Sequence, residues 1–179
     1  LPKNFWKTRI AAAYGVRKSL GLVTEENNTY RLIHGEGDFL PGLIVDVYAD
    51  TAVIQAHSVG MHYHREEIAE AIVKVVAQVD KVYYKSDDTL PHKANIQGDR
   101  VGYLIGGDKV EDKEFWAKEN GLSFRIDWLR GQKTGFFIDQ RDNRALLEQY
   151  AKDKDVLNMF CYTGGFSVYA LRGGAKKVH

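Results

Sequence analysis

Residues 156–166 read Val-Leu-Asn-Met-Phe-Cys-Tyr-Thr-Gly-Gly-Phe. The stretch begins with apolar residues typical of a buried strand, which we expect over residues 155–160. It passes through a paired glycine and leads into residues 166–171, for which we predict a helix. A strand, a glycine turn and a helix in this order present backbone N–H groups to a nucleotide-like ligand. The stretch therefore predicts the start of a parallel α/β unit, and a further strand begins at Val178.

A second informative stretch, residues 132–144, reads Gln-Lys-Thr-Gly-Phe-Phe-Ile-Asp-Gln-Arg-Asp-Asn-Arg. A short strand over residues 136–138 would pack one phenylalanine ring inward and turn the other toward an adenine or a base. A helix follows over residues 142–150, with Leu146, Leu147 and Tyr150 predicted to face inward. The alternative is the end of a hairpin, with an aspartate capping the helix and Arg144 in solvent.

Upstream, the pattern predicts a mixed α+β domain. We expect a helix over residues 4–20, strands over residues 30–34, 43–48, 52–57 and 81–85, an amphipathic helix over residues 66–79, and a hairpin of residues 114–117 and 123–128. The first three strands suggest an antiparallel meander. The hairpin is indicated by Asn120-Gly121, a sequence that favours a two-residue turn.

Composition limits the class of protein. The 179 residues are 44% hydrophobic and carry a net charge of +1, which does not by itself indicate a nucleic-acid binder. The single cysteine excludes an intrachain disulfide, so we expect a reducing, cytoplasmic location. No apolar run approaches the roughly 20 residues that span a membrane. The chain begins at Leu1 rather than Met, and we expect it to be a piece of a longer protein.

Three segments, in the same order, resemble one family. The first is Arg31-Leu32, Glu36, Asp38, Leu40-Pro41-Gly42-Leu43, Val45-Asp46 and Tyr48; the second is Lys133-Thr134-Gly135-Phe136-Phe137-Ile138-Asp139-Gln140-Arg141; the third is Val156–Phe166. Together they resemble the S-adenosylmethionine-dependent methyltransferases that act on cytosine C5 of large-subunit ribosomal RNA. The resemblance extends over about residues 29–178.

The resemblance implies a parent of three parts: a PUA-type RNA-binding domain, a central α+β domain and a Rossmann-like methyltransferase domain. On this basis residues 1–26 form a linker helix, residues 27–130 the central domain and residues 131–179 an incomplete start of the methyltransferase domain. The fold class is therefore α/β, as an α+β domain with an antiparallel sheet followed by the first βα unit of a Rossmann-like domain. The family's acidic residue after the second cofactor strand, its Asp-Pro-Pro loop and its catalytic cysteine would follow His179, so no catalytic residue is assigned.

The resemblance also implies the ligands. S-adenosyl-L-methionine is the expected cofactor, and ribosomal RNA the expected partner, with a cytosine flipped into the adjoining pocket. The expected cofactor-binding residues are Asn158, Phe160, Tyr162, Thr163, Gly164, Gly165, Phe166, Gln140 and Arg141; the expected substrate-binding residues are Arg130, Lys133 and Phe137. From the residues alone, paired glycines and a helix N-terminus suit a carboxylate. The alternative function is a non-catalytic RNA-binding or scaffold module whose glycine turn is purely structural.

Cys161 and the histidines suggest two further chemistries, a nucleophilic thiolate and a metal site, and we assign neither. A cysteine thiolate attacks the base in cytosine C5 methylation, but Cys161 lies inside the expected cofactor loop, so we do not assign it as the nucleophile. His62 and His64 are two residues apart, a spacing that points helical side chains to different faces. We therefore expect polar surface histidines and no metal site. The aromatic residues between 115 and 137 are expected to be mostly core.

Overall fold

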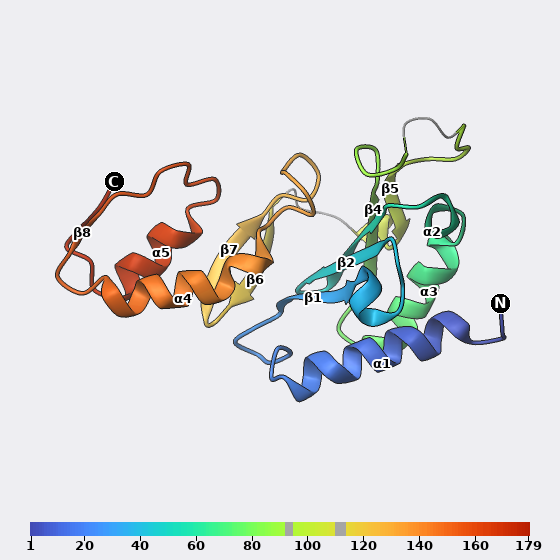
Figure 1. Ribbon diagram of the computed structural model, residues 1–179, viewed down its shortest axis with the longest axis horizontal. Coiled ribbons are helices and arrows are strands. Elements are labelled where there is room, and N and C mark those ends of the chain that lie inside the picture. The colour runs from blue at the N-terminus through green and yellow to red at the C-terminus, as the bar shows by residue number, and fades with distance from the viewer. Residues whose placement is uncertain (92–94, 110–113) are drawn as a thin grey trace.

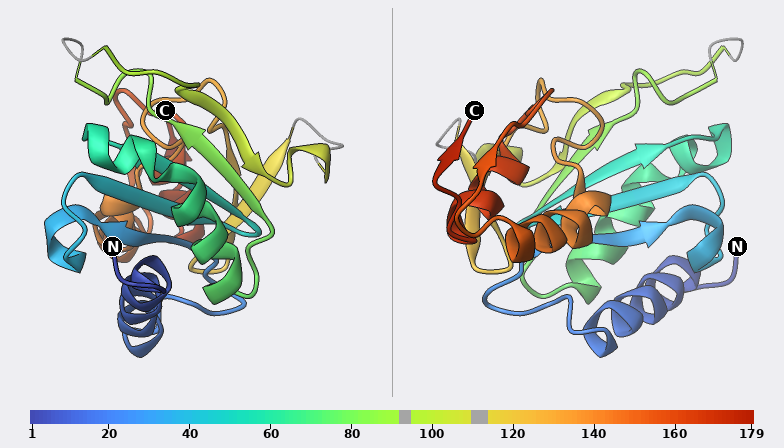
Figure 2. Two further views of the ribbon diagram at one scale, coloured as in Figure 1. Left: turned by 90° about the vertical axis from the view of Figure 1, so that its right-hand side faces the viewer. Right: turned by 60° about the vertical axis from the view of Figure 1, so that its left-hand side comes forward.

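The computed structural model describes residues 1–91, 95–109 and 114–179. A five-stranded sheet and the N-terminal helix lie at one end of its longest axis, and the C-terminal helices lie at the other (Figure 1). A two-stranded hairpin lies between them (Figures 1 and 2). No helix within the described ranges is both long and apolar enough to cross a bilayer.

The sheet is mixed. Its strands follow sequence order: β1 (Thr29–His34), β2 (Leu43–Tyr48), β3 (Thr51–Ala56), β4 (Lys81–Lys85) and β5 (Val101–Ile105). The pairs β1–β2, β2–β3 and β4–β5 are antiparallel, which confirms the predicted meander. The pair β3–β4 is parallel, so the expectation of a wholly antiparallel sheet is wrong at this pair. Helices α2 (Val59–Tyr63) and α3 (Arg65–Val75) form the crossover connection that a parallel pair needs.

One face of the sheet is covered by two helices, α1 (Phe5–Ser19) and α3. Helix α1 turns Trp6, Ile10 and Ala13 into the core, as its apolar spacing predicts. Helix α3 ends at Val75, four residues before the predicted end. Val76 is extended, with φ −100° and ψ 92°, because the chain must turn there toward β4. Val76 is nevertheless fully buried, which explains why its apolar position resembled a continuing helix.

The other face carries a second core. The hairpin of β6 (Phe115–Glu119) and β7 (Leu122–Ile126) packs with the segment after it against Tyr48, Val53 and Tyr83. Of the six rings between residues 115 and 137, Phe124, Trp128 and Phe136 are buried, Phe115 and Phe137 are half-buried and Trp116 is 56% exposed, so the expectation of core rings is confirmed for three and wrong for Trp116. Asn120 and Gly121 have φ of 49° and 77°, the two left-handed residues that a tight hairpin turn requires.

The C-terminal unit begins with the short 3-10 turn η3 (Ile138–Gln140) and helix α4 (Arg141–Tyr150). Strand β8 (Asp155–Val156), helix α5 (Gly165–Arg172) and strand β9 (Lys177–Val178) follow, and β8 pairs parallel with β9. The predicted strand–turn–helix–strand order is thus confirmed. The remaining 3-10 turns are η1 (Gly35–Asp38) and η2 (Gly107–Lys109).

Three local predictions in this unit are wrong. The strand over residues 155–160 stops after Val156, and Phe160 and Tyr162 have positive φ of 58° and 48°, a conformation that ends a strand. No strand forms at residues 136–138, because the chain turns at Gly135, with φ 114°, and enters η3. On α4, Leu146 and Tyr150 are 50% and 71% exposed, so they do not face the core.

Candidate cofactor and substrate site

The two segments singled out in the sequence meet at Tyr162. The Tyr162 hydroxyl accepts a hydrogen bond from the backbone N–H of Gln132 at 2.9 Å, and it lies 3.5 Å from the carbonyl oxygen of Gly135. Its ring packs edge-on against Phe137, with centroids 5.2 Å apart. The loop between β8 and α5 is therefore joined directly to residues 132–137, which lie 25–30 positions earlier in the chain.

The loop presents its side chains to solvent. Phe160 is 97% exposed and Met159 65% exposed, and Cys161 and Thr163 are exposed as well. The base of the loop is fixed at Asn158, whose side-chain amide donates to Ser167 Oγ at 2.8 Å. The backbone N–H of Asn158 donates to the carbonyl of His179 at 2.7 Å. The loop is therefore anchored at its base and leaves its other side chains accessible to a ligand.

The paired glycines have different roles. Gly164 has φ +75°, and a Cβ there would meet nothing within 4 Å, so space for a ligand lies beside it. A Cβ on Gly165 would lie 3.0 Å from Cδ of Arg144, so Gly165 allows α5 to pack closely. The first turn of α5 has no side-chain cap, which leaves its N–H groups for a ligand or water. These features fit a nucleoside with a carboxylate: room at Gly164, a ring at Phe160, and helix N–H donors.

The segment 132–137 is held to the sheet through Thr134. The Thr134 hydroxyl donates to Asp46 Oδ2 at 2.6 Å, so the Tyr48 hydroxyl, 2.8 Å away, must donate to Thr134. Asp46 also accepts two hydrogen bonds from the Arg31 guanidinium, at 2.8 and 3.0 Å. Burial and the Asp46 charge raise the pKa of Tyr48, which keeps the hydroxyl protonated. This network fixes the segment that contacts the loop.

A second buried network lies under the loop, around Glu119. Its carboxylate accepts hydrogen bonds from Arg144, with Nε and Nη2 both at 2.8 Å, and from the Tyr169 hydroxyl at 3.0 Å. Burial, then the Glu119 charge, raises the pKa of Tyr169. The expectation that Arg144 is solvated is wrong, since this residue is only 2% exposed. The sequence could not show its partner, which is a hairpin residue 25 positions earlier.

Arg141 and Gln140 both form polar contacts within the fold. The Arg141 side chain is 12% exposed; it donates to the carbonyl oxygen of Thr29 and lies 3.4 Å from Glu119. The Gln140 amide donates to Asp139 at 2.9 Å and accepts from Asn143 at 3.0 Å. Neither side chain contacts the loop within the described part of the chain, so their expected ligand contacts stay predictions.

The expected substrate residues lie within or just before the segment 132–137, which contacts Tyr162. Arg130 and Lys133 are exposed, and Phe137 is half-buried against Tyr162. Lys133 contributes to a pocket of about 270 Å³ whose other lining residues are Gln55, Lys85, Asp87, Asp88, Thr89, Gly131 and Gln132. Gln55 and Lys85 were not among the residues predicted from the sequence. The available signal was a glutamine inside the otherwise apolar run of β3.

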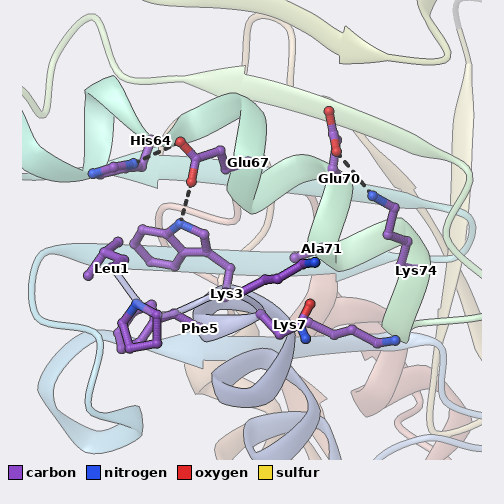
Figure 3. Close-up of a pocket in the computed structure, with 12 residues that line it drawn as sticks. Leu1, Lys3, Phe5, Lys7, His64, Glu67, Glu70, Ala71 and Lys74 are labelled. Atoms are coloured by element: carbon purple, nitrogen blue, oxygen red, sulfur yellow. Dashed lines mark hydrogen bonds and ion pairs between the residues drawn. The ribbon is translucent and has the colours of Figure 1, made fainter.

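The histidine weighed as a metal ligand, His62, has hydrogen-bond partners within the protein. His62 is fully buried, not on the surface as expected, and its ring nitrogens lie 2.8 Å from the Tyr84 hydroxyl and from the carbonyl of Gln97. No cluster of three potential ligands occurs within residues 1–91, 95–109 and 114–179. A larger pocket of about 410 Å³ lies between the start of α1 and α3, where Trp6 donates to Glu67 (Figure 3). It lies at the end of the molecule away from α5 (Figure 1).

The family follows from comparison with known proteins. A family model described as S-adenosylmethionine-dependent methyltransferase matches residues 30–179. The chain belongs to this family. The matched residues include both the segment 132–137 and the loop before α5, so the contact at Tyr162 joins two parts of one methyltransferase family region.

Relatives and solved structures agree with the family. Curated relatives named Ribosomal RNA large subunit methyltransferase I include one from Tolumonas auensis, 45% identical over 98% of this chain, and one from Vibrio cholerae, 38% identical over 99%. The structure of a proposed SAM-dependent methyltransferase from Streptococcus mutans is 28% identical over 98% of the chain, with a TM-score of 0.80. A further structure with the same identity and TM-score is of a methyltransferase complexed with SAH. The chain spans 43% of the Tolumonas relative and 43% of each of these structures.

Proposed function

We propose that this chain is part of an enzyme that transfers a methyl group from S-adenosylmethionine to cytosine C5 in large-subunit ribosomal RNA. The observation that carries the proposal is the contact of Tyr162 with Gln132 and Phe137, which places the open loop and the segment 132–137 side by side. The names of the curated relatives support ribosomal RNA as the substrate. The base and the atom rest on the motif resemblance.

In this proposal the loop and α5 bind the cofactor, which supplies the methyl group as an electrophile. The N–H groups at the start of α5 receive its carboxylate, and Gly164 leaves room for its close approach. The exposed rings of Phe160 and Tyr162 offer stacking surfaces, and the Asn158 amide, Thr163 and Phe166 complete the loop. Gln140 contributes at the start of α4. Arg141 acts by holding α4 to β1 and β6.

The substrate side is proposed to lie across Tyr162 from the cofactor. Arg130 and Lys133, both exposed, meet the RNA backbone, and the Phe137 ring lies beside the flipped base. Cys161 is exposed on the loop itself, and we do not assign it as the nucleophile. The proposal places the nucleophile in the part of the protein that corresponds to the remaining length of the relatives. Residues 1–26, 27–130 and 131–179 then serve as linker helix, central domain and the start of the methyltransferase domain.

Transfer of labelled methyl from S-adenosylmethionine to protein-free large-subunit RNA tests the proposal. The full-length protein is expected to label the RNA at a cytosine, and the 179-residue chain alone is expected to label none. The variant Cys161→Ser in the full-length protein should keep its activity. A full-length protein that binds RNA but neither binds S-adenosylmethionine nor transfers methyl would favour the RNA-binding scaffold instead.

A further inference from the structure

The second face of the sheet is covered over only part of its length. Tyr48, Val53 and Tyr83 lie beneath the hairpin and the segment after it. The same face continues along β3 to Gln55, two residues beyond Val53. The parallel register pairs Ile54 with Tyr84, which puts Gln55 next to Lys85 on this face. At Gln55 and Lys85 the sheet is no longer covered by the hairpin, and these two residues line the 270 Å³ pocket.

Gln55 is the unusual residue of this pocket. It is 7% exposed, and it lines the pocket from a strand whose other residues are all buried. Its side-chain amide has no hydrogen-bond partner in the described ranges of the chain. Two neighbours are already bonded: Thr89 donates to the carbonyl of Ala56 at 2.6 Å, and Lys85 donates to the carbonyl oxygen of Gly131. The Gln55 amide is not one of the fully enclosed polar atoms without a partner, so it remains open to the pocket, where it can hydrogen-bond to a ligand.

The lining suits a neutral, polar and planar ligand. Two cations, Lys85 and Lys133, are balanced by two acids, Asp87 and Asp88, so the pocket offers no net attraction to a phosphate group. An amide both donates and accepts hydrogen bonds, as the edge of an unpaired nucleobase requires. The volume is slightly below the roughly 300–1,000 Å³ of pockets for drug-sized ligands. A single base fits this description better than a peptide segment.

The position of the pocket connects it to the candidate site. Gln132 lines the pocket, and its backbone N–H donates to the Tyr162 hydroxyl on the cofactor loop. Lys133 and Arg130 are exposed around the same turn and can meet the phosphates on either side of a base. An RNA strand that reaches the loop from this side therefore passes over the pocket.

We propose that this pocket binds an unpaired RNA base that neighbours the target nucleotide, with the Gln55 amide hydrogen-bonded to the edge of that base. The proposal rests on the proposed function for its substrate, and it adds a contact in the central sheet, outside the cofactor loop. Binding here fixes the register of the strand relative to the nucleotide that is methylated.

The test compares Gln55→Leu with Gln149→Leu, a change at an exposed glutamine of α4, in the full-length protein. RNA affinity is measured without cofactor, by fluorescence anisotropy of a labelled RNA that contains the methylated region. Gln55→Leu is expected to weaken RNA binding about 2- to 12-fold, the loss of one ordinary hydrogen bond. Its melting temperature should be nearly unchanged, because the Gln55 side chain makes no hydrogen bond within the described residues that the change would remove. Gln149→Leu should bind as the unchanged protein does.

An abasic series identifies the base. Each RNA of the series lacks one base. At a single position that flanks the target nucleotide, loss of the base should make the RNA affinity of Gln55→Leu equal to that of the unchanged protein. Equal RNA affinity for both proteins, or a difference that persists at every abasic position, would overturn the proposal. RNA binding is measured without cofactor, so its outcome does not depend on methyl transfer. If the unchanged full-length protein fails to transfer methyl, that failure counts against the proposed function, whereas the RNA affinities still decide whether Gln55 contacts a base.

Discussion

The guanidinium of Arg144 forms a two-point ion pair with the carboxylate of Glu119 in the interior, with both N–O distances at 2.8 Å. The two side chains are 3% and 0% exposed. The pair links α4 to the hairpin, and the Arg144 guanidinium also lies over the ring of Phe136, 4.6 Å from its centroid. Gly165, the first residue of α5, packs against Arg144 from the other side. The start of α5 therefore packs against this ion pair.

Replacement of Glu119 by Gln should destabilise the chain strongly. It leaves the buried Arg144 cation without its counter-charge, and loss of one partner of a buried pair costs about 3–5 kcal/mol. The measurement is the free energy of unfolding in urea. The matched control is Glu148→Gln, which breaks the partly exposed pair with Arg172 and should cost only about 0–1 kcal/mol. Similar small losses for both variants would contradict the role given to Glu119.

The same pair shows what the sequence could and could not predict. Periodicity located helix α4 within one residue of its observed start, because that signal is local. The same periodicity predicted the wrong buried face of α4. Leu146 and Tyr150 have the apolar spacing of a buried face, but Arg144 is the residue that is buried, by its ion pair with Glu119. A long-range ion pair leaves no mark on a local pattern. The predicted end of strand β8 was wrong for a similar reason, because apolar residues continue after Val156 into an exposed loop.

The Asn120-Gly121 hairpin and the helix after the paired glycine were predictable, since glycine and asparagine positions determine turns locally. The two site segments could be recognised separately, but their contact through the Tyr162 hydroxyl depends on how the chain folds back. The glutamine inside the apolar run of β3 was a visible signal at Gln55, but the sequence does not show that its amide faces a pocket.

Replacement of Thr134 by Val should loosen the segment that contacts the loop. It removes the hydrogen bonds to Asp46 and Tyr48 while keeping the side-chain shape, and leaves buried groups unsatisfied, at a cost of about 1–3 kcal/mol. Urea unfolding measures this loss. Thr134→Ser keeps the hydroxyl and serves as the control, with a smaller effect. If the two variants unfold alike, the hydroxyl network does not hold the segment.

His57 should contribute to a loss of stability in mild acid. Burial, together with the positive charges of Lys133 and Arg31, lowers the pKa of His57 below its ordinary 6.5. The unfolded chain then takes up the proton first as pH falls, so stability is fully present above about pH 6.5 and declines below it, until the folded form is protonated too. His57→Gln should show a smaller decline between pH 7.5 and 5.5 in urea unfolding. Parallel pH profiles for variant and unchanged protein would refute this contribution.

The central claim is that the loop before α5 binds S-adenosylmethionine beside Gly164. The most direct measurement is calorimetric titration of S-adenosylmethionine into the full-length protein carrying Gly164→Val or Gly174→Val. Both glycines have positive φ, +75° and +86°, so both variants should lose a similar stability, about 1–3 kcal/mol. Gly164→Val fills the open space beside the loop and should weaken cofactor binding at least about 10-fold, or 1.4 kcal/mol, while Gly174→Val leaves it unchanged. Equal cofactor affinity in the two variants would contradict the account and return the glycine turn to a structural role.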